Sequence, residues 1–457
     1  MKRLSLVGLV GACALAVLLW FPTVDLPVVS DSALYALLGE SFWTEGQYAV
    51  LGELHRKHMP LHAVTAYPLV AAFGYSLGMK LATLLAGIGV LIAAYFLLKR
   101  TMGERAAYWG VILISLHHGF AVMTQLGSAD LLLTLFFLLT LHAYLSAERG
   151  LRWYLAMGLF LGLACLTRYN ALPLFLFLPL YTFWKLRNHL RSPWFIGGML
   201  LAAALASLWF LRNIAVFGTL ENDYTGELSI KSAGIFRQFF INASYYLDPL
   251  KNILPVLLPF AVYGAWRARK EQTFLITMMI GIWSLFAVWP VLNVRYAFPG
   301  YIVLLGFAVY GIFETSRFFG RFRPLFTGAV ISLALIADAG ALCLYASGSC
   351  NAWFDRTVDR IPKNLGLATE GFYTWDLARD WVNLHAEKGA IVRAQGDVNA
   401  RMFAGGIFRD DLQIVSYDAE RCPVYTIVQQ LVDGANVVFE TDDEPKTYVL
   451  KEECNGM

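Results

Sequence analysis

Long apolar runs alternate with short polar segments along the chain, from its first residues to about residue 346. A helix needs roughly 20 apolar residues to cross a bilayer, and several of these runs are shorter. Neighbouring residues therefore extend them, or some helices are broken where they line a cavity. We expect eleven membrane-spanning helices, at residues 4–22, 77–98, 106–124, 130–147, 153–168, 171–186, 194–211, 253–266, 273–291, 297–314 and 325–346.

Every second loop between these runs is short and basic. The positive-inside bias places such loops in the cytoplasm. The N-terminus is then cytoplasmic, and an odd number of spans places the C-terminus outside. The basic residues of these loops are Lys2 and Arg3; Lys99, Arg100 and Arg105; Arg149 and Arg152; Lys185, Arg187 and Arg191; Arg267, Arg269 and Lys270; and Arg317, Arg321 and Arg323.

The first apolar run has a second interpretation, because Val10-Gly11-Ala12-Cys13 resembles the lipobox of a cleaved signal peptide. Apolar residues nevertheless continue to Phe21, without the polar start of a mature chain. We interpret this run as a retained first span.

Three large segments lie on the extracytoplasmic side in this topology: residues 23–76, 212–252 and 347–457. We therefore expect the chemistry on that side. The fold class is an α-helical polytopic membrane protein, with a transmembrane domain over 1–346 and a soluble α/β domain over 347–457. In the latter we expect a helix over 372–388, strands at Ala390–Gln395, Ile414–Tyr417, Val437–Glu440 and Tyr448–Lys451, and a helix over Val424–Val432.

Composition supports this fold class. The chain is 58% hydrophobic and only 15% charged, whereas soluble domains carry about 25% charged residues. This excludes a water-soluble enzyme. The net charge of +3 gives no basic field for nucleic acid. Of the six cysteines, Cys350, Cys422 and Cys454 lie outside the membrane in this topology, and Cys422–Cys454 is our candidate disulfide.

Five ionisable residues lie near the outer membrane boundary. Each of the arginines alone could be a side chain that snorkels to the interface. Together they favour a site, because arginine binds phosphate through paired hydrogen bonds and carboxylates act as general bases or metal ligands. The five residues are Asp31, Asp130, Arg168, Arg212 and Arg295.

The first outer loop contains two further features. Ser30–Glu40 begins with a good N-cap and continues as an amphipathic helix, which we expect on the membrane surface; Asp31 could then be a helix cap alone. Three histidines, His55, His58 and His62, follow. They lack the tight spacing of metal ligands and Pro60 interrupts any helix, so we infer no metal and no other cofactor.

The order of these motifs resembles the polytopic GT-C glycosyltransferases, in the branch that contains protein O-mannosyltransferases and lipid A aminoarabinose transferases. The resemblance covers roughly residues 1–315. The segments that carry it are Asp31-Ser32-Ala33-Leu34-Tyr35-Ala36, His58-Met59-Pro60-Leu61, Ala129-Asp130-Leu131-Leu132-Leu133-Thr134, Leu166-Thr167-Arg168, Leu211-Arg212-Asn213 and Arg295-Tyr296.

The resemblance implies a sugar donor on a polyprenyl phosphate and transfer with inversion on the extracytoplasmic face. Asp31 would be the general base, and Asp130 would orient the acceptor or a first-loop residue. The donor phosphate would be held by His58 or its neighbour Lys57, together with Arg168, Arg212, Arg295 and Tyr296.

The chain also departs from the family pattern. Ser32 replaces an acidic residue and Leu34 replaces the basic residue of the aminoarabinose branch, so we do not assign that branch. The WWDYG motif of oligosaccharyltransferases is absent from the sequence. The acceptor stays open among a lipid, a glycan and a protein.

Two other functions compete with a transferase of the prokaryotic plasma membrane. A lipid-phosphate or solute transporter would show internal repeats and polar residues at mid-membrane, whereas here the polar residues cluster at one face. A ligase of lipid-linked glycans would share the architecture.

Overall fold

The structure is a computed structural model of the full chain. It describes residues 2–21, 24, 31–50, 53–219, 235–247, 256–285, 289, 294–347, 378–379, 381–394, 412–415, 424–428, 436–441 and 448–452. The cysteines of the candidate disulfide, Cys422 and Cys454, lie outside these residues.

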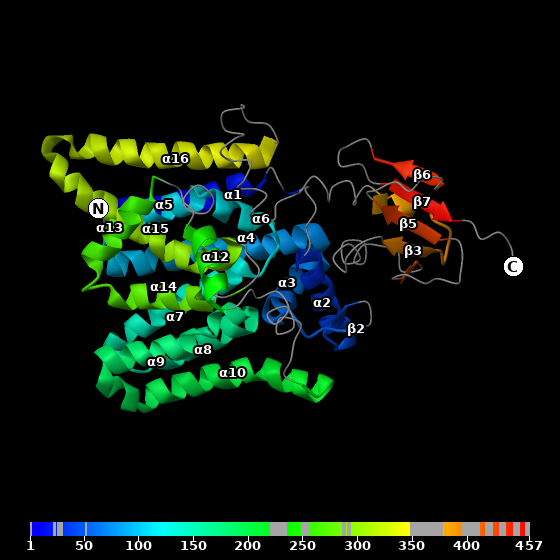
Figure 1. The fold of residues 1–457 in the computed structure, drawn as a ribbon, viewed down its shortest axis with the longest axis horizontal. Helices are drawn as coiled ribbons and strands as arrows, with labels where there is room; N and C mark the ends of the chain where they lie inside the picture. Colours follow the sequence, from blue (N-terminus) through cyan, green and yellow to red (C-terminus); the bar gives the residue numbers. More distant parts are fainter. Residues whose placement is uncertain are drawn as a thin grey trace.

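Helices lie side by side along most of the chain (Figure 1). The first part comprises α1 (Lys2–Trp20), α2 (Asp31–Glu45), α3 (Leu61–Phe73), α4 (Tyr75–Thr101), α5 (Glu104–Leu116), α6 (His118–Gln125), α7 (Asp130–Ser146) and α8 (Trp153–Thr167). The second part comprises α9 (Leu174–Lys185), α10 (Pro193–Phe217), α12 (Ile235–Leu247), α13 (Leu258–Ala268), α14 (Thr273–Ser284), α15 (Val294–Ser316) and α16 (Arg323–Ser347). Short 3₁₀ turns connect several of them: η2 (Ala147–Arg149), η3 (Tyr169–Ala171), η4 (Arg187–Arg191) and η6 (Arg317–Phe322).

All eleven predicted apolar runs overlap helices in the described residues. By length and composition, four helices there are long and apolar enough to cross a membrane: Tyr75–Thr101, Asp130–Arg149, Pro193–Phe217 and the run Arg295–Ala337. A fifth span results if the bent pair Glu104–Leu116 and Gly119–Gln125 is counted as one. The chain is therefore a helical membrane protein, and the number of eleven spans stays a prediction.

Close helix contacts depend on glycine. A Cβ atom on Gly158 of α8 would overlap the backbone of Gly198 in α10, and a Cβ on Gly198 would overlap the carbonyl of Tyr154. Gly264 of α13 and Gly311 of α15 make the same kind of mutual backbone contact. Small residues allow helix backbones to approach in a membrane, where apolar lipid leaves little hydrophobic driving force between helices.

The first outer loop folds as a compact unit against one end of the helical bundle. It contains α2, a short antiparallel pair of strands, β1 (Ala49–Val50) and β2 (Glu53–Leu54), and α3. The prediction of an amphipathic surface helix was wrong in one respect. Every residue from Ser32 to Gly39 is buried, because α2 packs on α3 and α4 and its side chains join Met59, Ala63 and Trp209 in one core.

The described residues of the C-terminal segment form a five-stranded sheet with its own core. The strands β3 (Ile391–Ala394), β4 (Gln413–Val415), β5 (Val424–Val428), β6 (Val437–Glu440) and β7 (Tyr448–Glu452) lie in the order β4-β3-β5-β7-β6. The strand β3 pairs in parallel with β4 and β5, and β7 pairs antiparallel with β5 and β6. The predicted helix over Val424–Val432 was wrong, because its first half is the fully buried central strand β5.

Candidate active site

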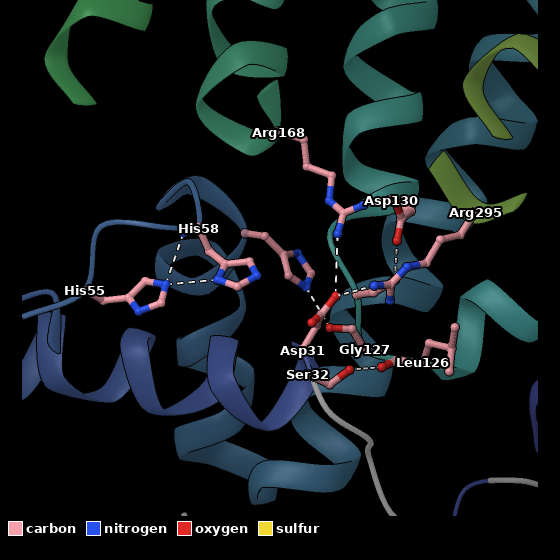
Figure 2. A network of polar contacts seen from close by, with 11 residues as sticks. Asp31, Ser32, His55, His58, Leu126, Gly127, Asp130, Arg168 and Arg295 are labelled. Carbon is pink, nitrogen blue, oxygen red and sulfur yellow. Dashed lines mark hydrogen bonds and ion pairs between the residues drawn. The ribbon is translucent and has the colours of Figure 1, made fainter. Parts of the chain in front are cut away.

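Asp31 lies where three segments distant in the sequence meet (Figure 2). It is the first residue of α2, so its carboxylate faces the ends of the neighbouring helices. Its Oδ2 accepts a hydrogen bond from Nη2 of Arg295 at 2.6 Å and lies 3.6 Å from Nη2 of Arg168. The side chain of Asp31 is 19% exposed, so the ion pair is shielded but still open to a ligand.

The charge of Asp31 is set by competition between burial and these arginines. Burial alone raises the pKa of a carboxyl group, because it penalises the charged form. The positive charge of Arg295 first, and that of Arg168 after it, outweigh burial and hold the pKa of Asp31 well below its usual value. At neutral pH Asp31 is therefore a carboxylate that can accept a proton.

Asp130 holds Arg168 in place from the inside. Asp130 begins α7 and is fully buried. Its Oδ1 accepts a hydrogen bond from Nη1 of Arg168 at 2.5 Å, and its Oδ2 accepts one from Oγ of Ser128 at 2.9 Å. The guanidinium of Arg168 thus bridges the two aspartates, with one nitrogen toward each. Removing Asp130 would leave a buried cation without its strongest partner.

The turn before α7 is fastened to the first outer loop by two side chains. Oγ of Ser32 donates to the carbonyl of Leu126, and Nε2 of His62 donates to the carbonyl of Gly127 at 2.9 Å. Gly127 adopts a φ of +65° and has no room for a side chain beside Ser32. Ser32, which replaces an acidic residue of the family pattern, therefore positions Asp31 relative to Asp130.

Two histidines form a second polar pair on this loop. Nε2 of His55 and Nδ1 of His58 are 2.9 Å apart, and the rings are stacked. Burial first, with nearby positive charges, lowers the pKa of His58 to about 3, although Asp31 opposes the shift. His58 is therefore neutral at neutral pH, and the permanent cation of the pair Lys57 and His58 is Lys57.

Aromatic rings cover the charged groups. The ring of Tyr296 lies under both guanidinium groups, 5.2 Å from Arg168 and 5.3 Å from Arg295. The ring of Tyr35 meets His58 edge-on at 5.5 Å, and burial raises the pKa of Tyr35 to about 12. These contacts fix the directions of the cations and keep water from much of their surface.

A pocket opens beside this cluster. Of the residues predicted for the site, four line it. The lining residues are Tyr35, Lys57, His58, Met59, Thr167, Arg168, Tyr169, Asn170, Leu285, Trp289 and Tyr296. A cavity whose lining combines cations and hydrogen-bond donors with apolar groups suits a ligand that is part phosphate and part hydrocarbon.

Asn170 is a lining residue that sequence reasoning missed. It is 8% exposed, and within the described residues its Nδ2 has no hydrogen-bond partner. A buried amide donor without a partner costs free energy unless a ligand accepts its hydrogen bond. Its position two residues after Arg168 was the available signal, but an asparagine in a helix-ending turn has many structural explanations.

Arg212 is not brought to the pocket. Its Nη1 donates to the carbonyl of His55 at 2.6 Å and its Nη2 to the carbonyl of Tyr48 at 3.2 Å. Arg212 therefore holds the backbone of the first outer loop against α10. Among the described residues, no three His, Cys, Asp or Glu side chains are grouped as they would be to hold a metal ion.

Comparison with known proteins gives a sequence match over part of the chain and a structural likeness over nearly all of it. A sequence profile of the dolichyl-phosphate-mannose-protein mannosyltransferases matches residues 62–210. The crystal structure of ArnT from Cupriavidus metallidurans bound to undecaprenyl phosphate matches with a TM-score of 0.64 at 15% identity, covering 98% of both chains. Its apo structure gives a TM-score of 0.66 at 14% identity, covering 97% of both.

A second kind of enzyme shares the fold. The apo oligosaccharyltransferase of Archaeoglobus fulgidus matches with a TM-score of 0.54 at 14% identity, covering 88% of this chain and 64% of that chain. No curated protein sequence matches the chain. At these identities the structural likeness shows a common fold. The resemblance to GT-C glycosyltransferases expected from the sequence is thus confirmed, in the fold and in the matched segment of sequence.

Proposed function

We propose that the protein is an inverting glycosyltransferase, which moves a sugar from a polyprenyl-phosphate donor to an acceptor on the extracytoplasmic side of the membrane. The observation that carries the proposal is the ionised Asp31 held between Arg295 and Arg168 beside the pocket. A proton acceptor next to fixed cations suits an attack in which one group loses a proton while another leaves as an anion.

In the proposed reaction an acceptor hydroxyl attacks the anomeric carbon from the face opposite the phosphate. A bond forms between the acceptor oxygen and that carbon, while the bond from the carbon to the phosphate oxygen breaks. The electron pair of the broken bond goes to the polyprenyl phosphate. The hydroxyl proton goes to Asp31, and one attack of this kind inverts the anomeric configuration.

The other residues take distinct roles in this proposal. Lys57 and Arg168, which line the pocket, stabilise the negative charge on the leaving phosphate, with Arg295 beside them. Asn170 donates its unused hydrogen bond to the phosphate or the sugar. Asp130 is a positioning residue, because it is fully buried and acts through Arg168.

Two alternative functions, a ligase of lipid-linked glycans and a transporter, differ from this proposal in the donor or in the chemistry. A ligase of lipid-linked glycans would use the same groups with a longer donor. A transporter would bind the lipid phosphate without releasing it from its sugar. A carboxylate beside the phosphate cations favours chemistry over transport, because a carrier gains nothing from a negative charge next to an anionic ligand.

The test is turnover of purified protein in lipid nanodiscs with a panel of polyprenyl-phosphate sugars. Release of polyprenyl phosphate is the readout. Asp31→Asn keeps the shape of the side chain and should lower release at least ~100-fold, because general base catalysis contributes about 10²–10⁴-fold. Donor binding should remain. Tight binding without release by the native protein under every acceptor would favour a carrier, and full release by Asp31→Asn would remove Asp31 from the chemistry.

A further inference from the structure

A second groove lies at the other end of the helical bundle, away from α2 and α3. It is open to its surroundings and runs between α5, α15 and α16. The N-terminus marks this end of the bundle in Figure 1. Two arginines, Arg105 at the start of α5 and Arg323 at the start of α16, line it together with the apolar side chains Trp109, Ile331 and Leu335.

Two carboxylates next to the groove in the sequence, Glu104 and Glu314, pair with other basic side chains. Glu104 pairs with Lys99 at 3.4 Å, and Glu314 pairs with Arg317 at 2.9 Å and Arg267 at 3.8 Å. Within the described part of the chain, Arg105 has no ion pair or hydrogen bond, and Arg323 has a hydrogen bond from its Nε to Oγ of Ser316 at 3.1 Å. Two positive charges thus face one groove without a carboxylate between them.

We propose that this groove binds an anionic phospholipid, with its phosphate between Arg105 and Arg323 and an acyl chain along Ile331 and Leu335. Arginine fits phosphate through paired hydrogen bonds. Basic pockets between membrane helices are typical sites for anionic head groups on the cytoplasmic side, where this topology places both arginines. The apolar lining distinguishes this groove from a basic surface patch, which would attract any anion. The site is independent of the proposed transfer reaction.

Charge and shape can be tested separately. The double variant Arg105→Gln/Arg323→Gln removes both cations. The variant Gly328→Leu instead fills the groove, because a side chain at Gly328, which lines the groove on α16, would extend into open space without a clash. Arg149→Gln/Arg191→Gln is the matched control, since both are exposed arginines in basic loops that do not line the groove.

The measurement is native mass spectrometry of the full chain titrated with phosphatidylglycerol or with phosphatidylcholine of the same acyl chains. Each arginine near a lipid phosphate contributes about 1 kcal/mol, so the double variant should bind the first phosphatidylglycerol about 30-fold more weakly. Gly328→Leu should weaken it clearly as well. The control pair should change it by less than about threefold, and Arg105→Lys/Arg323→Lys should lose less affinity than the glutamine pair, because it keeps the charges but not the paired hydrogen bonds.

Three results would overturn the proposal. One is an equal loss of phosphatidylglycerol affinity in Arg105→Gln/Arg323→Gln and in the control pair, which would mean that general surface charge explains the effect. Another is unchanged phosphatidylglycerol binding in Gly328→Leu, which would place the lipid outside the groove. The third is equal affinity for phosphatidylcholine in the native protein. Unaltered elution on size exclusion would show that each variant is folded.

Discussion

At the scale of single residues, the site is organised by one guanidinium that serves two carboxylates. Arg168 contacts the buried Asp130 at 2.5 Å and the more open Asp31 at 3.6 Å. The shorter contact holds the arginine, and the longer one leaves part of its charge available to a ligand. A bound phosphate would add negative charge beside Asp31 and thereby raise the pKa of that carboxyl, which makes it a better base when the donor is present.

The low pKa of Asp31 predicts the pH dependence of the reaction. With Arg295 present, kcat/KM should not fall from protonation of Asp31 above about pH 4, the usual pKa of an aspartate. Arg295→Gln removes the largest opposing charge. Burial then dominates, and the acid limb of kcat/KM should rise about 1–3 pH units above the usual aspartate pKa of about 4. Rates between pH 4.5 and 8.5 provide the measurement.

Arg212→Gln is the comparison for that profile. Arg212 holds backbone carbonyls of the first outer loop, so its loss should lower the rate at every pH. The position of the acid limb should not change. An identical profile in native protein and Arg295→Gln would mean that Asp31 does not set the limb.

Lys57 and His58 should differ in their contribution to donor binding. Lys57 carries a permanent charge, whereas His58 is neutral because its pKa is lowered to about 3. A hydrogen bond to a charged group contributes about 1.5–3 kcal/mol, so Lys57→Gln should weaken binding of polyprenyl phosphate at least ~10-fold at pH 7.5. His58→Gln should weaken it much less. Microscale thermophoresis would measure both, and an equal loss in a folded His58→Gln would return the cationic role to His58.

Most residues of the site could be predicted from the sequence, but their charge states and some of their partners could not. Asp31, Asp130, Arg168 and Arg295 were singled out because charges of both signs gather at one membrane face, against the positive-inside bias, and the structure brings these four together. The neutral state of His58 depends on burial by distant segments, which no local pattern records. Arg212 looked equivalent to the other arginines in sequence, since the carbonyls it binds come from a loop more than 150 residues away.

At the scale of elements, α2 was located correctly but its environment was not. Its first residues looked like a surface helix with one apolar face, yet Ser32 to Gly39 are all buried. The hydroxyl of the buried Ser32 donates its hydrogen bond to the carbonyl of Leu126 instead of to solvent.

In β5 the run Val-Tyr-Thr-Ile-Val has strong strand propensity, and all five side chains are buried, as in a central strand. The predicted helix over Val424–Val432 went against this propensity.

The close contact between α8 and α10 should not tolerate a larger side chain at Gly198. A Cβ on Gly198 would overlap the carbonyl of Tyr154. Gly198→Val should therefore push the helices apart and cost about 1–3 kcal/mol, as overpacking typically does. Gly197→Val is the control, because its Cβ would lie 3.4 Å from Leu155, an ordinary contact. Thermal unfolding in detergent should show a lower Tm for the first variant alone. An equal Tm in both would contradict the close packing.

At the scale of the whole molecule, the helical bundle has two chemically different ends. One end carries the clustered aspartates and arginines of the site, and the other carries the short basic loops and the groove with Arg105 and Arg323. The first end has a folded loop over the pocket, whereas the second has short turns such as η2, η4 and η6. This polarity is what a protein with chemistry at one membrane face requires.

The same polarity predicts the orientation of the chain. Six basic loops place the N-terminus in the cytoplasm, and eleven spans then place the C-terminal segment outside. A tag after residue 457 should therefore be digested by protease added to intact spheroplasts, while a tag before residue 1 should be protected until the membrane is opened. Cysteine labelling of a variant in which the six native cysteines are replaced by serine provides a second readout: a cysteine at exposed Arg149 should stay unlabelled by an impermeant reagent, and one at exposed Leu384 should be labelled. Equal exposure of both tags would mean an even number of spans, and the run Arg295–Ala337, with its kink at η6, would be the first place to recount.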